Sequence, residues 1–424
     1  MKKNHPSKID QEEIIYERCA GIDVHKKMIM VCLRIGYKTQ VREFGTLTCE
    51  LREMSEWLKE NDVQMIAMES TGSYWKPLYN VFEQQGIPAM VVNAGHMKSV
   101  PGRKTDVKDA EWIAKLLSHG LLKSSFIPNR EQRELRELTR FRKNQIEERS
   151  RTLNRLQKML EGANIKLSSL VSNIYGKSAT QMLELIIGKE EFSAQEIEKL
   201  RHVNMKASTD ELFKSLEGII TPIQRELFTH IMNVIKEQTA QIDKTESQIL
   251  GYMTQAYQDA VKAIETIPGI GQISAQQIIA EIGIDMSRFP DAAHLCSWSG
   301  ICPGNNESAR VRKSGKTNYA NKTLKSTLVQ CAQSAKKNDE SFFHAQYQRL
   351  VVRRGKNRST LAVAHSLLIA IYHVLNGKPF CDLGADYYNR FNKEKKINSY
   401  VKQLSKLGVN VPDDVIRMVL IKTA

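Results

Sequence analysis

The sequence predicts an α/β domain followed by all-α domains, because three patterns follow one another along the chain. Short β-rich runs come first and then alternate with amphipathic helical runs, which is typical of a mixed sheet covered by helices. Two long helical stretches with apolar stripes come next, and they indicate a paired-helix arm. The rest of the chain is predicted to be helical. We therefore expect three domains, over residues 1–125, 126–262 and 263–424.

The first domain is predicted element by element from its apolar periodicity. Alternation and short apolar runs predict strands within residues 19–35, 40–47, 63–70 and 87–94. Apolar positions three and four apart predict helices over 49–61, 73–86 and 106–120, and Gly120 ends the last of them. Strands that form a meander before they alternate with helices predict a mixed α/β sheet.

The second domain is predicted to be an arm of two long helices, over 130–160 and 222–255. Leucine and isoleucine recur at helical spacing on both, among many charged residues. An antiparallel coiled coil and an ordinary pair of bundle helices with solvated charged faces both fit this pattern. Between the two helices, over roughly 165–220, we expect a polar helical insertion without a chemical signature.

The charge balance favours polyanionic partners. The 62 Lys and Arg residues outnumber the 47 Asp and Glu residues, which gives a formal charge of +15 and a pI near 9.3. Nucleic acid fits this excess better than an anionic membrane surface does. The N-terminus shows no apolar signal core, and the longest apolar stretch, 360–375, is interrupted by two histidines and is too short for a span. We expect a cytoplasmic protein without a membrane partner.

The cysteines predict neither disulfides nor a zinc ribbon. There are seven of them, an odd number, and no two form a CxxC pair. His294, Cys296 and Cys302 could offer three metal ligands, but a fourth is missing and their spacing is irregular. Reduced thiols are the expectation.

Four carboxylates are candidates for a shared site. Asp23 lies in the first strand, Glu69 ends a buried strand, and Asp106 and Asp109 share one face at the start of a helix. Carboxylates brought together repel one another, and such a cluster is tolerated when divalent cations, best Mg²⁺, neutralise it. Two such ions can activate a nucleophile and stabilise the leaving oxygen in phosphodiester transfer.

Each of these acids also has a purely structural interpretation. Asp106 is a good helix N-cap, Asp109 complements the helix dipole, and Glu69 and Asp23 could each serve a turn. Their order, with two strand acids followed by a helix pair beside Lys104, favours the site over four unrelated caps. The set therefore suggests chemistry on a nucleic-acid backbone.

Residues 263–283 carry a helix-hairpin-helix pattern. Two predicted helices flank the sequence Ile-Pro-Gly-Ile-Gly, in which Gly269 and Gly271 permit a tight turn. Backbone N–H groups at the start of the second helix could hold a phosphate without reading base sequence. A plain helical hairpin inside a core is the alternative.

A basic, turn-rich loop follows, with a serine among cations. Ser308 precedes several basic residues, which would surround its hydroxyl with phosphate-binding groups. A serine nucleophile needs a base, a metal or a cation to stabilise its alkoxide. Ser299 and Ser314 are equally available on composition alone. The cations are Arg310, Arg312, Lys313 and Lys316.

Taken together, these motifs resemble the insertion-sequence transposases of the "one-ten" family. The resemblance rests on "GIDVHKK", "MESTGSYWKPLYNVFEQQG", "VNAGHMKSVPGRKTDVKDAEWIAKLL", "IPGIGQISAQQIIAEIG", "FPDAAHLCSWSGICPGNNESARVRKSGKT", "AQYQRLVVRRGKNRSTLAVAHSLLIAIYHVL" and "LGADYYNR". Only the 165–220 insertion and the tail after about 392 fall outside it. The family combines a domain like the RuvC Holliday-junction resolvase, of the RNase H-like class, with a C-terminal transposase domain.

The resemblance implies a role for each site. Asp23, Glu69, Asp106 and Asp109 become a DEDD tetrad that binds Mg²⁺, and Ser308 becomes the catalytic serine. It further implies DNA as donor and target, an element-encoded guide RNA, and a homo-oligomer, dimer or tetramer, held by the coiled coil. The absence of a helix-turn-helix or zinc-finger motif for reading bases suits such a division of labour.

The sequence therefore predicts a DNA recombinase of an insertion sequence, in which Ser308 forms a phosphoserine intermediate at a composite site with the tetrad. Two other interpretations stay open. In a structure-specific RuvC-like nuclease, the tetrad activates water and Ser308 takes no part. In a non-enzymatic nucleic-acid-binding protein, the acids are helix caps.

Overall fold

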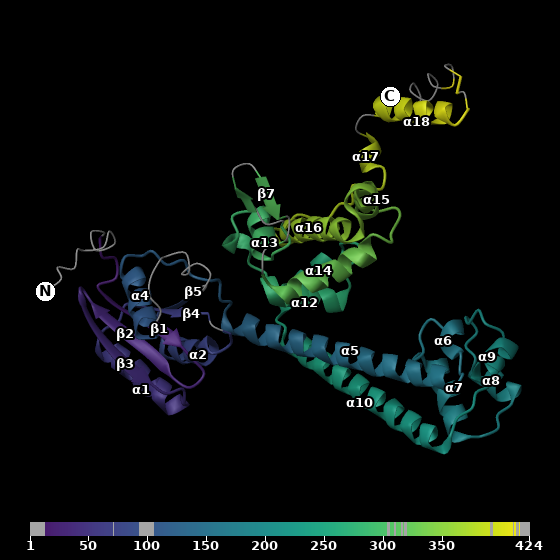
Figure 1. The fold of residues 1–424 in the computed structure, drawn as a ribbon, viewed down its shortest axis with the longest axis horizontal. Helices are drawn as coiled ribbons and strands as arrows, with labels where there is room; N and C mark the ends of the chain where they lie inside the picture. Colours follow the sequence, from purple (N-terminus) through teal and green to yellow (C-terminus); the bar gives the residue numbers. More distant parts are fainter. Residues whose placement is uncertain are drawn as a thin grey trace. The chain divides into compact units, whose positions relative to one another are not determined.

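The computed structural model divides into two compact units, Met1–Pro128 and Asn129–Ala424, which are described separately (Figure 1). The described residues are 13–70, 72–92, 106–302, 306–308, 311–314, 317, 320–390, 393–409, 411–412 and 415. Side chains are described for these except at 106–108, 306–308, 311–314, 389–390 and 393–396.

The first unit is built on a five-stranded sheet in the order β3-β2-β1-β4-β5. The strands are β1 (Arg18–Val24), β2 (Ile29–Ile35), β3 (Lys38–Phe44), β4 (Met65–Glu69) and β5 (Ala89–Val92). β1, β2 and β3 form an antiparallel meander, whereas β1, β4 and β5 are parallel. The predicted mixed sheet is confirmed, and its parallel half follows from the helices that return the chain to the same edge.

Helices cover both faces of this sheet. Alternate residues of β1, such as Ile22, pack with α1 (Thr48–Glu60) and α2 (Trp75–Gln85) in one apolar core. The residues between them, such as Cys19, face α4 (Asp106–Ser118) on the opposite side. Because side chains alternate along a strand, each face of β1 serves a different layer.

Gly21 allows α4 to approach β1 closely. A Cβ at this position would lie 2.9 Å from Ala114 Cα and closer still to Ala114 N and Ala110 O. Only glycine leaves room for this helix backbone against the strand. The approach determines how near the first turn of α4 comes to the end of β1.

The second unit begins with the two long helices, α5 (Arg130–Gly162) and α10 (Pro222–Tyr252), which run antiparallel side by side (Figure 1). Asn129 caps α5 and Thr221 caps α10, each accepting a hydrogen bond from the backbone N–H three residues ahead. The expected helix pair is present. Four short helices join its far ends, namely α6 (Leu167–Leu170), α7 (Lys177–Gly188), α8 (Ala194–Leu200) and α9 (Thr209–Leu216).

The segment between the long helices has its own hydrophobic core. Leu183, Ile197 and Leu212 are fully buried and pack against Leu156 of α5 and Phe228 of α10. The expected helices are therefore present, but "polar insertion" describes only their outward faces. Apolar residues spread over short helices give little periodic signal, so the core emerges only when the helices are brought together.

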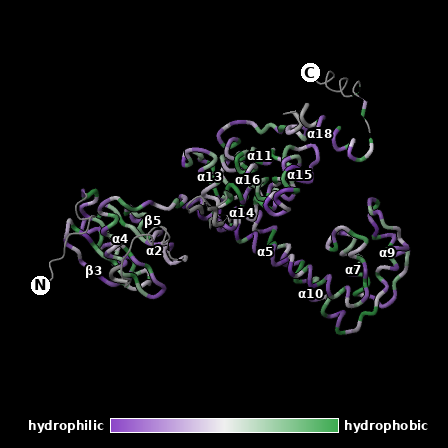
Figure 2. Tube along the Cα trace, turned by 45° about the horizontal axis from the view of Figure 1, so that its top comes forward, coloured by the Kyte–Doolittle hydropathy of each residue, from purple (hydrophilic) through white to green (hydrophobic). Residues whose placement is uncertain are grey.

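A helical body follows the arm. Its helices are α11 (Gln255–Glu265), α12 (Gln272–Ile282), α13 (Ala292–Trp298), α14 (Lys322–Ala335), α15 (Phe342–Arg354) and α16 (Lys356–Leu375), with a 3-10 turn over Met286–Arg288. Figure 2 shows hydrophobic residues gathered among α11, α14 and α16. Two further helices, α17 (Tyr387–Arg390) and α18 (Lys393–Lys406), follow.

The expectation of purely helical structure after residue 263 is wrong in one place. Strands β6 (Asn306–Ser308) and β7 (Val311–Ser314) form a two-stranded antiparallel sheet between α13 and α14. The strands are too short to show alternation in the sequence, and they are identified only by their hydrogen-bonded pairing with each other.

Helix α16 contains the long apolar stretch. Within the described part of the chain, it is the one helix long and apolar enough to cross a membrane. Val363, Leu367 and Ile371 on this helix are fully buried in the core of the helical body. Its apolar character is accounted for by that packing.

Candidate active site

The carboxyl ends of β1 and β4 bring two of the candidate acids together. These strands are parallel neighbours, and Ile22 lies opposite Met68. Asp23 and Glu69 are the next residues on each strand, so both point to the sheet face that α4 covers. Asp23 is only 6% exposed, whereas Glu69 is half-buried.

Asp109 approaches the same place from the first turn of α4. Its side chain is half-buried, and its carboxylate and that of Glu69 both interact with Asp23. The pKa of Asp23 is raised, first by burial and then by the negative charges of Asp109 and Glu69. The structure therefore places three acids that are far apart in the sequence at one end of the sheet, within electrostatic range of Asp23.

His25 is a neighbour that sequence reasoning missed. Its Nε2 lies 3.1 Å from Asp23 Oδ2, and its charge and hydrogen bond partly offset the rise in the Asp23 pKa. The signal was present in the sequence, because His25 lies only two residues after Asp23, directly beyond the end of β1. A histidine touching a buried acid can orient it.

Two other candidates near this cluster are not described to the same depth. Asp106 is the first residue of α4, three positions before Asp109, but its side chain is outside the described set. Lys104 lies outside the described residues altogether. Among described side chains, no three His, Cys, Asp or Glu residues come close enough to share a metal ion.

Ser308 ends strand β6 and does not lie in an irregular loop as predicted. It is paired with Val311 across the hairpin, and a register shift occurs between Asn306 and Glu307. The side chains of Ser308, Arg312 and Lys313 are outside the described set, and Arg310 and Lys316 lie outside the described residues.

The structure separates the alternative serines. Ser299 is completely buried, and its Oγ donates a 2.8 Å hydrogen bond to the Cys296 carbonyl at the end of α13. It is therefore a helix-terminal residue without access to a substrate. Ser314, at the end of β7, shares the hairpin with Ser308 and lies opposite Asn306.

A buried carboxylate anchors the chain where it leaves this hairpin. Asn321 caps α14 by accepting from Leu324 N at 3.1 Å, and its Nδ2 donates to Glu281 Oε2 at 2.6 Å. Glu281 is completely buried and accepts two hydrogen bonds from Arg140, at 2.6 and 2.8 Å. Arg136 adds an ion pair at 3.2 Å. One carboxylate thus connects α5, α12 and the start of α14.

The two glycines of the predicted phosphate-binding turn have different surroundings. Gly269 has φ +87° and packs so tightly on α14 that a Cβ would lie 2.6 Å from Cys331 O and Ala335 N. Gly271 is exposed, with open space around it, and begins α12 without a side-chain cap. Gly269 therefore serves packing, and the uncapped end of α12 at Gly271 is the part that faces solvent.

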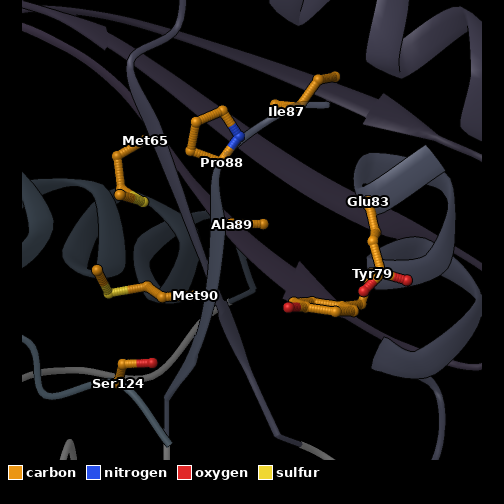
Figure 3. A pocket seen from close by; sticks show the side chains of 8 residues that line it. All are labelled: Met65, Tyr79, Glu83, Ile87, Pro88, Ala89, Met90 and Ser124. Atoms are coloured by element: carbon orange, nitrogen blue, oxygen red, sulfur yellow. The ribbon is translucent and has the colours of Figure 1, made fainter. Parts of the chain in front are cut away.

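A pocket of about 460 Å³ lies elsewhere in the first unit. Figure 3 shows it between α2 and the start of β5, where Tyr79, Glu83 and Ala89 line it. Met65 and Ala89 begin their strands, so this pocket adjoins the amino ends of β4 and β5. Asp23 and Glu69 lie at the carboxyl ends, where parallel sheets usually place their sites. The largely apolar pocket is therefore separate from the carboxylates.

Two relatives resemble the chain over most of its length. The transposase for insertion sequence element IS1111A of Coxiella burnetii is 20% identical over 372 residues, which are 86% of this chain and 91% of that protein. A probable family 20 transposase of Pseudomonas aeruginosa is 23% identical over 315 residues, 73% of this chain and 77% of the relative.

Two family models match the segments that carry the candidate residues. The DEDD transposase model of IS110 matches residues 20–165, which include all four acids. The model of the IS116/IS110/IS902 transposase family matches residues 261–348, which include the glycine turn and Ser308. Because the two matches follow one another in the chain and together cover more than half of it, this chain belongs to the IS110 family of insertion-sequence transposases.

Proposed function

We propose that the chain cleaves and rejoins DNA strands with Ser308 as nucleophile, at a site completed by the four acids of a RuvC-like first unit. The observation that carries this proposal is the convergence of Asp23, Glu69 and Asp109 at the carboxyl end of the parallel strands. A buried carboxylate beside two others is costly, and a site that binds cations and phosphates gives a reason for retaining it.

The donor set suits magnesium. All the candidate ligands are carboxylate oxygens, which Mg²⁺ prefers, and the buried Asp23 gains most from a neutralising cation. Asp23, Glu69, Asp106 and Asp109 would hold the ion, with His25 orienting Asp23. Bound Mg²⁺ would supply positive charge to the phosphate under attack.

The proposed reaction conserves the number of phosphodiester bonds. Ser308 Oγ forms a bond to phosphorus while the bond to the departing DNA hydroxyl breaks, and that hydroxyl takes up a proton as the serine releases one. The strand is then held as a phosphoserine ester. The hydroxyl of a new strand attacks the same phosphorus and restores the serine. Arg310, Arg312, Lys313 and Lys316 would bind the flanking phosphates.

The proposed partners are those of an insertion-sequence recombinase. We propose DNA as both donor and target, an element-encoded guide RNA that selects the sites, and a cytoplasmic homo-oligomer. The paired helices α5 and α10 would contribute to assembly as a coiled coil, and the uncapped start of α12 at Gly271 would hold the DNA backbone as part of a helix-hairpin-helix. Gly269 supports that turn through its packing on α14.

The test is to trap the covalent intermediate. The wild-type chain is incubated with a nicked DNA substrate and Mg²⁺, and denaturing electrophoresis should reveal a protein-linked DNA band. Ser308→Ala should remove the band and strand exchange while DNA binding persists. Ser314→Ala, in the same hairpin, is the matched control and should keep the band. If Ser308→Ala retains the band, another group of the protein forms the covalent bond and Ser308 is not the nucleophile. If an active wild type never forms the band, metal-activated water is the nucleophile and the nuclease interpretation replaces ours.

A further inference from the structure

A second basic surface lies at the junction of α15 and α16, on residues to which no role was assigned above. Only Gly355 separates the two helices, with φ +75°, and Gln346 of α15 donates to Ser366 of α16 at 2.9 Å. These positions are nearly equidistant from Gly355, so the helices form an antiparallel hairpin. We call Arg353, Arg354, Lys356 and Arg358 the basic tip of this hairpin.

The basic tip is exposed on a rigid support. All four side chains are exposed, as are Val352 and Asn357 between them. From the next residue α16 enters the core, where Ser359 and Thr360 are buried and bond back to the carbonyls of Gly355 and Lys356. The hairpin therefore holds four cations within six residues on helix ends rather than on a loose loop.

The tip is not neutralised by nearby acids. Residues 341–381 contain no Asp or Glu at all. Among the described side chains, none of the four cations has an acidic group within ion-pair distance. The arm differs, because there Arg136 and Arg140 are both paired with the buried Glu281. Four clustered positive charges without internal partners repel one another and gain from an external anion.

The nearest acids by sequence stand at the other end of the hairpin. Asp382 accepts from Phe342 N at the start of α15, where a negative charge complements the helix dipole. A helix of 13 residues places that end roughly 20 Å from the tip. Acids therefore occupy one end of α15 and cations the other, which gives the hairpin a polarity suited to meeting a polyanion at its tip.

We infer that the basic tip binds the phosphodiester backbone of nucleic acid, as a contact separate from the serine hairpin and from the glycine turn. Three or four arginines and lysines on a helical hairpin can reach successive phosphates and recognise no base sequence. A membrane surface fits less well, because Val352 is the one apolar side chain exposed at the tip and interfacial binding needs a larger apolar face. The inference rests on the proposed DNA function, and it adds a surface at which the nucleic-acid backbone is anchored.

The experiment measures binding without catalysis. Full-length protein carrying Ser308→Ala is titrated, in magnesium-free buffer, against labelled duplex DNA of mixed sequence and against RNA of the same sequence. Arg353→Ala/Arg354→Ala/Arg358→Ala should reduce the slope of log K against log salt by about 2 to 3, because each lost duplex-DNA phosphate contact removes about 0.9. If the two proteins bind equally at about 1 M salt, this slope change corresponds to binding that is roughly 100- to 1,000-fold weaker at about 0.1 M.

Two control variants isolate the tip from net charge. Lys199→Ala/Lys206→Ala/Lys236→Ala removes the same charge from exposed positions on the arm and its far helices, and should change the slope much less. The corresponding Arg→Lys triple variant at the tip should keep most of the slope, because lysine also neutralises phosphate. Melting temperatures of all variants should agree, since the substituted side chains are exposed.

The outcomes separate this inference from the function on which it rests. A wild type that binds neither nucleic acid overturns the proposed function itself. A wild type that binds both, with an unchanged slope in the tip variant, overturns only the inference, as does an equal loss in the lysine control. A slope change with DNA alone assigns the tip to the DNA substrate, and a change with RNA alone assigns it to the guide. The same variants are also titrated against anionic vesicles. Binding to vesicles instead of nucleic acid, if it depends on the basic tip, would contradict both the inference and the proposed function.

Discussion

Replacing Gly21 with alanine should pull the carboxylates apart by moving α4. The new Cβ would lie 2.9 Å from Ala114 Cα and closer still to Ala114 N and Ala110 O, which are backbone atoms that cannot rotate away. Carbon contacts are favourable at about 3.5 to 4.0 Å, so α4 has to retreat by roughly 1 Å. Because α4 carries Asp109 and β1 carries Asp23, the two carboxylates separate.

The substitution has a small effect on stability and a large one on activity. Overpacking of this kind costs about 1 to 3 kcal/mol of unfolding free energy, which a domain of this size survives. A displacement of about 1 Å among catalytic groups can lower a rate by about 100-fold. We therefore expect Gly21→Ala to fold with a lowered melting temperature and to exchange strands about 100 times more slowly than the wild type.

Gly36→Ala is the matched control for this loss of stability. Gly36 turns between β2 and β3 with φ +58°, and the space around it is open. Alanine there costs about 1 to 2 kcal/mol through its left-handed backbone and leaves α4 in place. Strand exchange and thermal melting are measured for both variants. If Gly21→Ala exchanges strands as fast as Gly36→Ala, the close approach of α4 does not determine the site's geometry.

Further predictions concern the acids and the charge. Asp23→Asn should abolish Mg²⁺-dependent strand exchange, yet it should raise the melting temperature at pH 7 in the presence of a chelator. Burial and two neighbouring acids raise the pKa of Asp23 in the folded protein, so ionisation of Asp23 lowers the stability of the wild type as the pH rises through that pKa. The gain should vanish at lower pH; a constant gain would show that charge is not the cause. Asp109→Asn should also abolish exchange, and unchanged exchange would remove it from the site. Glu281→Ala should cost about 3 to 5 kcal/mol in urea unfolding, because two arginines lose their buried partner, whereas the exposed Glu226→Ala should change little. DNA affinity should fall steeply with salt, and a flat dependence would contradict phosphate binding.

Much of the candidate site could be predicted from local sequence. The apolar runs placed Asp23 in the first strand and Glu69 at the end of a buried strand, and the periodicity after Asp109 placed it at a helix start. Local sequence could not show that β1 and β4 are neighbours, because strand order depends on pairing between distant segments. His25 was missed for a related reason, since its importance depends on the burial of Asp23.

The serine hairpin and the arm's far helices mark the limit of periodic patterns. Ser308 stands in a segment that reads as a turn, and its strand exists through pairing with residues 311–314. The core around Leu183 and Leu212 takes side chains from several short helices, and none of these helices has enough apolar periodicity to predict the core from the sequence.

The sequence by itself determined the order of helices and strands, the residue types of the site and the excess of positive charge, because these depend on neighbouring residues and on composition. Only the tertiary structure decided which acids meet, which serine is buried and which cations are left without partners. Ser299 and Ser308 are the same residue type, yet Ser299 lies at the end of a helix inside the core and Ser308 ends a strand of a hairpin. Arg140 and Arg353 are likewise the same residue type, but Glu281 is folded against the first and no described acid reaches the second. Burial and pairing between distant segments, which no local pattern encodes, account for both differences.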